Sequence, residues 1–131
     1  MASVFTKIVN GEIPSYIVAQ DDNYYAFLDI NPLKEGHTLV IPKKETNYIF
    51  DIEDKDYQGL CMFAKKIAIA IKKAIPCKRV GVAVLGMEVP HAHIHLVPLD
   101  KESDLNMSNK KLKLTPERFE EIAKTIAQAL N

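Results

Sequence analysis

The segment His91-Ala92-His93-Ile94-His95-Leu96-Val97 alternates histidines with apolar residues. Because successive side chains of a β-strand point to opposite faces of the sheet, this alternation predicts a strand over 92–97. The histidines would share one face, with neighbouring rings about 6–7 Å apart. The residues expected to face the core on the other side are Ala92, Ile94 and Leu96.

Three further segments have the residue pattern of strands. Residues 24–28 and 38–41 are rich in apolar side chains and flank a loop, so they are expected to pair as a hairpin with a long connection. Residues 79–85 are rich in valine and alanine. The stretch 86–90 is short enough to join them to the histidine strand as a hairpin loop.

Two helices are expected in addition. Over 51–75, apolar residues recur every three or four positions, and Pro76 ends the pattern. Over 115–130, Thr115 is a suitable cap and Pro116 suits the first turn. The sequence therefore predicts an α+β fold, an antiparallel sheet with one long helix and a C-terminal helix.

Length and composition indicate an ordinary globular chain. The 131 residues suit a single domain over 1–131, with the helix over 115–130 as a C-terminal extension. Seventeen basic residues balance seventeen acidic ones, which gives no reason to expect nucleic acid or an anionic membrane as a partner. No apolar run approaches the roughly 18 residues that span a membrane. No signal peptide or cysteine pair is evident, so a cytoplasmic location is expected.

The four histidines of the chain carry its most distinctive chemistry: His37, His91, His93 and His95. Imidazole has a pKa near 6.5, so the neutral ring can act as a nucleophile or pass protons near neutral pH. Two such rings side by side on one strand suit group transfer through a covalent intermediate. Two alternatives are a zinc site built from the same histidines and a solvent-exposed polar face without function.

Gly86 opens the loop that leads into the histidines. Glycine there allows backbone N–H groups to turn toward an anion such as phosphate. A plain hairpin turn is the alternative.

The histidine segment resembles the motif of the histidine triad family. Residues 4–14 look like the family's N-terminal signature, and 26–32 and 36–43 look like its nucleotide-binding segment. The resemblance covers residues 3–99 and is closest to the Hint-like branch of small purine-nucleotide-binding hydrolases.

The resemblance implies specific catalytic roles. His93 would attack the α-phosphorus of a nucleotide derivative, and water would then hydrolyse the nucleotidyl-histidine and release a nucleoside monophosphate. His95 would contact the phosphate and protonate the leaving group. His91 and His37 would orient the cluster and relay protons. Neither a cofactor nor a metal is expected.

The resemblance also implies a binding site and a partner. Asp29 would bind the ribose hydroxyls, although it could instead be a turn residue. The base pocket, for which core packing is the alternative role, would comprise Phe5, Ile8, Phe27 and Ile30. The loop residues expected at the substrate are Gly86, Glu88 and Val89. A homodimer would form by sheet extension and pairing of the helix over 51–75.

The sequence departs from the family pattern at three places. Ser3 and Thr6 stand where many relatives carry a cysteine pair of a zinc site. Leu85 and Gly86 occupy a shortened loop that lacks an asparagine. Glu88 replaces a small hydroxyl residue, which puts a carboxylate near the leaving group. The helix over 115–130 is a candidate cover for the leaving-group side.

Three functions remain open from the sequence. The leading one is a hydrolase of purine nucleoside phosphoramidates or dinucleoside polyphosphates. The second is a nucleotide-binding regulatory or scaffolding module with little activity. The third is a metalloenzyme that uses the four histidines.

Overall fold

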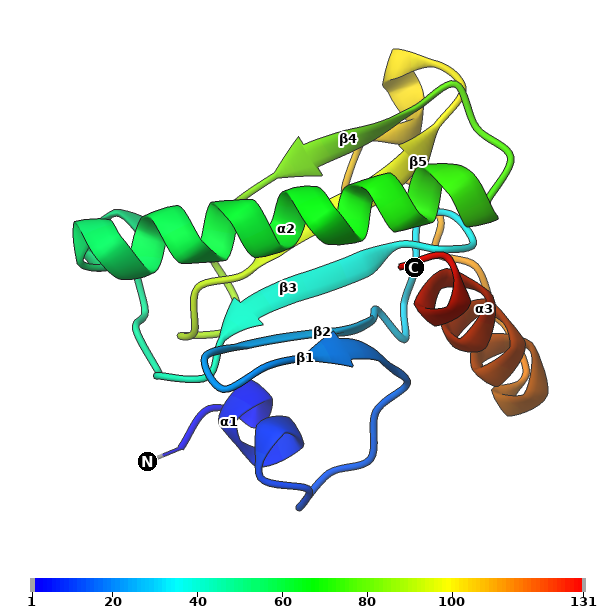
Figure 1. The fold of residues 1–131 in the computed structure, drawn as a ribbon. Coiled ribbons are helices and arrows are strands. Elements are labelled where there is room, and N and C mark those ends of the chain that lie inside the picture. The colour runs from blue at the N-terminus through cyan, green and yellow to red at the C-terminus, as the bar shows by residue number, and fades with distance from the viewer. Residues whose placement is uncertain (1, 131) are drawn as a thin grey trace.

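The computed structural model, which describes residues 2–130, is an α+β fold built on one antiparallel sheet (Figure 1). The sheet has five strands in the order β1-β2-β3-β5-β4. The strands are β1 Ile17–Gln20, β2 Tyr24–Leu28, β3 Thr38–Pro42, β4 Arg79–Ala83 and β5 Ile94–Leu99. The helices are α1 Val4–Val9, α2 Asp54–Ala74 and α3 Pro116–Gln128, with 3₁₀ turns at Ile49–Asp51 and Glu102–Asp104.

The two faces of the sheet bury two separate apolar clusters. Tyr24, Ala26 and Leu28 of β2 belong to the larger cluster, which includes the buried faces of α2 and α3. The intervening Tyr25 and Phe27 belong to the smaller cluster, which includes Phe5 of α1. Helices therefore cover both faces, with α2 across one and α1 against the other (Figure 1).

The facing of the histidine segment is confirmed. Ala92, Ile94 and Leu96 lie in the larger cluster under α2. The histidines point to the opposite face, but that face is not open to solvent. His91 is completely buried and His95 is only 9% exposed, so the interpretation as a solvent-exposed polar face is wrong.

The predicted strand over 92–97 begins later than expected, at Ile94. The N–H of His91 bonds to the carbonyl of Val89, and that of Ala92 bonds to the carbonyl of Thr46. These donors lie before the β-ladder, so His91 and His93 belong to a loop rather than to β5.

The other predicted elements are confirmed with small shifts of their ends. The hairpin of β2 and β3 and the pairing of β4 with β5 are antiparallel, as expected. The long helix begins at Asp54 rather than 51, and β4 ends at Ala83 rather than 85. Thr115 caps α3 by accepting the N–H of Arg118. Neither α1 nor β1 is predicted from the sequence. Within residues 2–130, no helix has the length and apolar character needed to cross a bilayer.

Candidate active site

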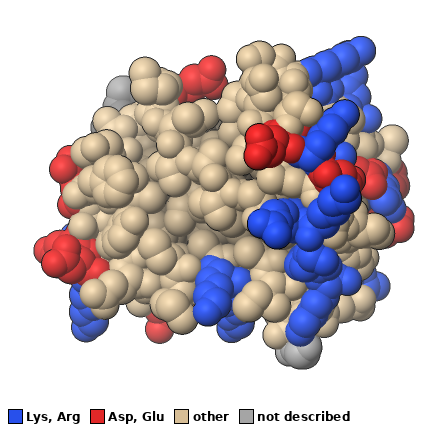
Figure 2. All heavy atoms as spheres, turned by 90° about the horizontal axis from the view of Figure 1, so that it is seen from above, with Lys and Arg blue, Asp and Glu red and all other residues tan. Residues whose placement is uncertain are grey.

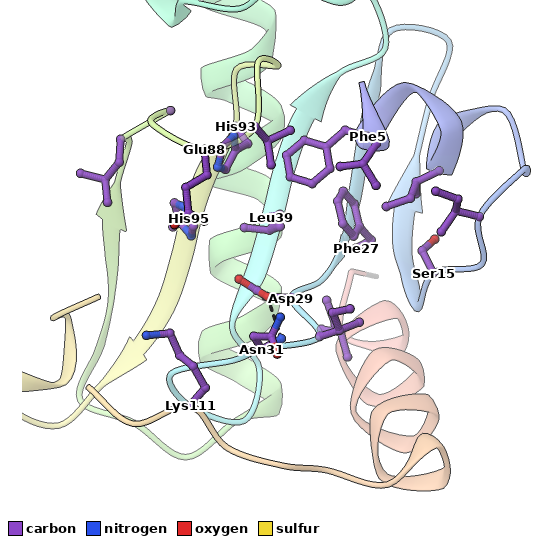
Figure 3. A pocket seen from close by; sticks show the side chains of 18 of the residues that line it. Phe5, Ser15, Phe27, Asp29, Asn31, Leu39, Glu88, His93, His95 and Lys111 are labelled. Carbon is purple, nitrogen blue, oxygen red and sulfur yellow. Dashed lines mark hydrogen bonds between the residues drawn. The ribbon is translucent and has the colours of Figure 1, made fainter. Parts of the chain in front are cut away.

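A pocket of about 490 Å³ opens on the α1 side of the sheet, among the loop before β5, the end of β2 and the residues after β5 (Figure 3). It contains every residue predicted to bind substrate, together with two of the predicted catalytic histidines. These residues are Phe5, Ile8, Phe27, Asp29, Ile30, Gly86, Glu88, Val89, His93 and His95. His91 and His37 do not line the pocket but contact the residues that do.

One end of the pocket is apolar. Phe5 and Phe27 meet edge to face, with ring centroids 5.5 Å apart, and both are buried in the smaller cluster. They therefore pack in the core and also present surface to the pocket. Ile30 is 64% exposed, so core packing does not account for its position. The phenyl ring of Phe5 also packs edge-on against His93, which ties the apolar end to the histidines.

The hydrogen bond of His93 fixes which of its nitrogens is free. Its Nδ1 lies 2.8 Å from the carbonyl oxygen of His91. A carbonyl only accepts, so Nδ1 carries the proton and the neutral ring keeps its lone pair on Nε2. His91 thus acts on its neighbour through its backbone carbonyl.

A second chain of hydrogen bonds fixes the opposite tautomer in His95. The N–H of Leu33 donates to Nδ1 of His37 over 3.0 Å, so the proton of neutral His37 lies on Nε2. That Nε2 donates to Nδ1 of His95, also over 3.0 Å. Neutral His95 therefore carries its proton on Nε2. Its ring centroid is 4.9 Å from that of His93, so a ring with its lone pair on Nε2 and a ring with its N–H on Nε2 are neighbours, and both line the pocket.

Burial keeps this relay uncharged. Desolvation, helped by neighbouring charge, lowers the pKa of His37 to about 3 and that of His95 to about 4. Both rings are neutral near pH 7, as the relay requires. Burial also raises the pKa of Asp29, whose Oδ1 accepts the N–H of Asn31. Asp29 is therefore both a turn residue and a pocket residue.

His91 is held by groups that the sequence does not reveal as partners. Its Nε2 donates to the carbonyl of Pro42 over 2.7 Å, so its Nδ1 accepts the hydroxyl of Ser3 at 2.8 Å. Glu45 in turn accepts the backbone N–H of Ser3 at 2.6 Å and the hydroxyl of Thr6 at 2.7 Å. The two hydroxyl residues that replace a cysteine pair thus join α1 to the loop of His91.

The histidines are better explained by these hydrogen bonds than by a metal. Within the described residues, Asp29, His37 and His95 form one group whose ligand atoms lie within 4.8 Å of one another. Binding an ion there would break the hydrogen bond between His37 and His95. His91 has both ring nitrogens bonded already. The donor set therefore fits a proton relay better than a metal site.

Comparison with known proteins assigns the family. The sequence model of the HIT domain matches residues 10–102. The chain belongs to the HIT domain family. A Borreliella burgdorferi protein described as an uncharacterized HIT-like protein is 38% identical over 132 residues, which cover 95% of each chain. The Saccharomyces cerevisiae adenosine 5'-monophosphoramidase HNT1 is 38% identical over 106 residues, covering 79% of this chain and 67% of that protein.

The fold agrees with that assignment. A crystal structure of a Hit-like protein from Bartonella henselae superposes with a TM-score of 0.85 at 33% identity, covering 97% of this HIT chain and 95% of the other.

Several pocket residues of this HIT chain are not predicted from its sequence. Leu39 of β3 lies within the expected nucleotide-binding segment 36–43 but is not singled out there, and it lines the pocket together with Ser15, which precedes β1. Met107 and Lys111 come from the segment after β5, beyond the residues that match the family. Residues 101–113 are mostly polar, and nothing local in them signals a pocket.

Proposed function

We propose that this HIT protein hydrolyses a purine nucleotide derivative at its α-phosphate and releases a nucleoside monophosphate. The observation that supports this most directly is the pair of opposite tautomers on neighbouring rings. Nε2 of His93 is a free lone pair, and Nε2–H of His95 is a donor. A nucleophile and an acid placed together are what a two-step phosphoryl transfer requires.

In the first step, Nε2 of His93 forms a bond to the α-phosphorus as the bond to the leaving atom breaks. The leaving atom takes the proton from Nε2 of His95. His93 becomes cationic, and His37 Nε2–H offsets the negative charge left on the ring of His95. In the second step, a water molecule gives a proton to His95 and attacks phosphorus. The phosphorus–nitrogen bond to His93 then breaks.

The pocket supports a purine nucleotide as the substrate. The aromatic surface of Phe5 and Phe27, with Ile30 and Ile8 beside it, suits a flat apolar base. Asp29 lines the same pocket, below Leu39 in Figure 3 and within reach of both the apolar end and His95, where it could meet the ribose of a bound nucleotide. Its carboxylate can accept hydrogen bonds from ribose hydroxyls.

The covalent intermediate provides the direct test. The protein is mixed with adenosine phosphoramidate, quenched in alkaline denaturant, and measured by intact-protein mass spectrometry. We expect AMP release and a protein species heavier by one adenylyl group, located on His93 by peptide mapping. Turnover without an adduct, or an adduct on another residue, would contradict the mechanism.

The leaving group that we propose is an amine rather than a polyphosphate, because Glu88 lines the pocket that holds His93 and His95. Its side chain lies at the histidine end in Figure 3, away from the apolar end. A carboxylate there repels an anionic leaving group and tolerates a neutral or cationic one.

Glu88→Ser is therefore expected to shift substrate preference. The ratio of kcat/KM for diadenosine triphosphate to that for adenosine phosphoramidate should rise about 3-fold to 10-fold, since an exposed charge is partly screened. Glu117→Ser, which removes an exposed carboxylate in the first turn of α3, is the matched control. An unchanged ratio in Glu88→Ser would remove Glu88 from leaving-group selection.

A nucleotide-binding module with little activity is the second candidate, and the same carboxylate favours it. A carboxylate on the leaving-group side would slow the turnover of nucleotide derivatives with anionic leaving groups, while the apolar end of the pocket could still hold the nucleoside part of AMP. Calorimetric binding of AMP, with no release of AMP from either substrate class, would support this alternative over the hydrolase.

We also propose that the protein forms a homodimer through β4 and α2. β4 is an edge strand, and Val82 on it is 61% exposed. Met62 and Ile69 on α2 are 63% and 49% exposed. Seen from the β4 side, a broad area carries neither acidic nor basic side chains (Figure 2). Sedimentation equilibrium tests the proposal, and a monomer at micromolar concentration would contradict it.

The cytoplasmic location remains a prediction.

A further inference from the structure

Lys111 is the one cationic side chain among the described residues that line the pocket. It lies after β5, outside the residues 10–102 that match the family, so the family pattern does not supply it. In Figure 3 it rises from the C-terminal segment on the side of the pocket that holds Asp29 and His95. The other charged residues of the pocket lining are the carboxylates of Asp29 and Glu88.

The ammonium group is held in place by its own loop. Lys111 Nζ donates to the carbonyls of Met107 and Asn109, the latter at 2.9 Å. An ammonium group has three N–H donors, so one remains for a ligand. The side chain is half-buried, which limits the rotamers that it must give up on binding.

The segment that carries Lys111 is fastened to the loop between β2 and β3. The N–H of Leu112 donates to the carbonyl of Pro32 over 2.9 Å. Arg118 of α3 forms a bidentate pair with Glu35, with nitrogen–oxygen distances of 2.8 and 2.6 Å. The same loop supplies Leu33, whose N–H orients His37. Lys111 is thus fixed relative to the histidine relay.

The pocket needs a cation if it is to hold a phosphate. His37 and His95 are neutral near pH 7 because burial lowers their pKa values. An anion placed beside neutral rings and two carboxylates would lose its hydration without gaining an opposite charge. Lys111 is close enough to Asp29 to affect its ionisation. Burial, the largest effect, raises the pKa of Asp29, and the positive charge of Lys111 is one of the effects that lower it.

We propose that Lys111 binds a phosphate oxygen of the nucleotide, so that the segment after β5 completes the anion site of the pocket. This inference rests on the proposed function for the identity of the ligand. The phosphate oxygen could belong to the α-phosphate or to a phosphate of the leaving group, and the experiment separates the two.

Calorimetry with AMP and with adenosine tests the lysine directly. Lys111→Met should weaken AMP binding about tenfold while changing adenosine binding less than twofold, because only AMP carries the charge. Lys111→Arg should retain most of the AMP affinity. Lys110→Met, which removes the exposed neighbouring charge, is the matched control and should leave both affinities unchanged. Equal weakening of AMP and adenosine binding in Lys111→Met would indicate a merely structural role and overturn the proposal.

Kinetics then identify the phosphate and separate this inference from the hydrolase itself. An equal loss of kcat/KM for adenosine phosphoramidate and diadenosine triphosphate in Lys111→Met supports a contact with the α-phosphate. A loss confined to the triphosphate supports a contact with the leaving group. If the wild type turns over its substrate normally and Lys111→Met binds AMP as tightly as the wild type, the lysine site is overturned and the proposed hydrolase function stands. An AMP-specific loss of affinity in a protein that turns over nothing supports the lysine site and rejects the hydrolase.

Discussion

His93→Ala is expected to lower kcat for adenosine phosphoramidate by at least about 10⁴-fold, because it removes the nucleophile of the proposed covalent step. The remaining histidines cannot replace it. His91 has both ring nitrogens bonded, and the lone pair of His95 accepts the proton of His37. Steady-state release of AMP measures the loss, and the adenylyl adduct should disappear with it.

The control for this variant is its fold and its ligand affinity. His93 packs against Phe5, so alanine leaves a gap at the pocket wall. AMP binding and the thermal unfolding midpoint should therefore be compared with those of the wild type. His93→Gly with added imidazole is the stronger control, because a free ring in the gap can restore part of the turnover. Residual activity in His93→Ala above about one per cent of wild type would exclude His93 as the nucleophile.

The facing of the histidine segment follows from a local rule, whereas its backbone pairing does not. Ile94 and Leu96 reach the core because side chains of extended backbone alternate whether or not the backbone belongs to a sheet. The start of β5 depends instead on Thr46. Its carbonyl accepts the hydrogen bond from the N–H of Ala92, which keeps that N–H out of the β-ladder. A partner so far away in the sequence leaves no local trace.

The short helix α1 shows the same limit. A six-residue helix is not stable alone, so its formation depends on tertiary contacts rather than on its own propensity. Ser3 and Glu45 supply one such contact, and Phe5 supplies another through the smaller apolar cluster. The resemblance indicates that Phe5 and Ile8 lie at the site, but only the fold shows how they are brought there.

The residues that complete the pocket from the C-terminal side depend on distant contacts in the same way. Lys111 reaches the pocket because Leu112 is bonded to Pro32 and Arg118 to Glu35. Neither pair has a signature in a polar stretch of sequence. The four histidines were predictable as a cluster, but the distinct use of His91 through its carbonyl was not.

His95→Ala is expected to lower kcat in a way that depends on the leaving group. An alkylamine leaves a phosphoramidate only with a proton, so turnover of an alkyl phosphoramidate of AMP should fall by about 10²-fold to 10⁴-fold. A p-nitrophenyl ester of AMP leaves as a stable anion and needs no proton, so its loss should be under about tenfold. The ratio of the two losses measures proton donation by Nε2–H of His95.

His37→Ala distinguishes proton donation from simple placement of the ring. Without His37, Nδ1 of His95 loses the donor that fixes its tautomer, while the ring of His95 keeps its place on β5. The loss should again be larger for the alkylamine than for p-nitrophenolate, and smaller than in His95→Ala. Equal losses for the two leaving groups in both variants would mean that these rings position the phosphate and that the proton comes from elsewhere.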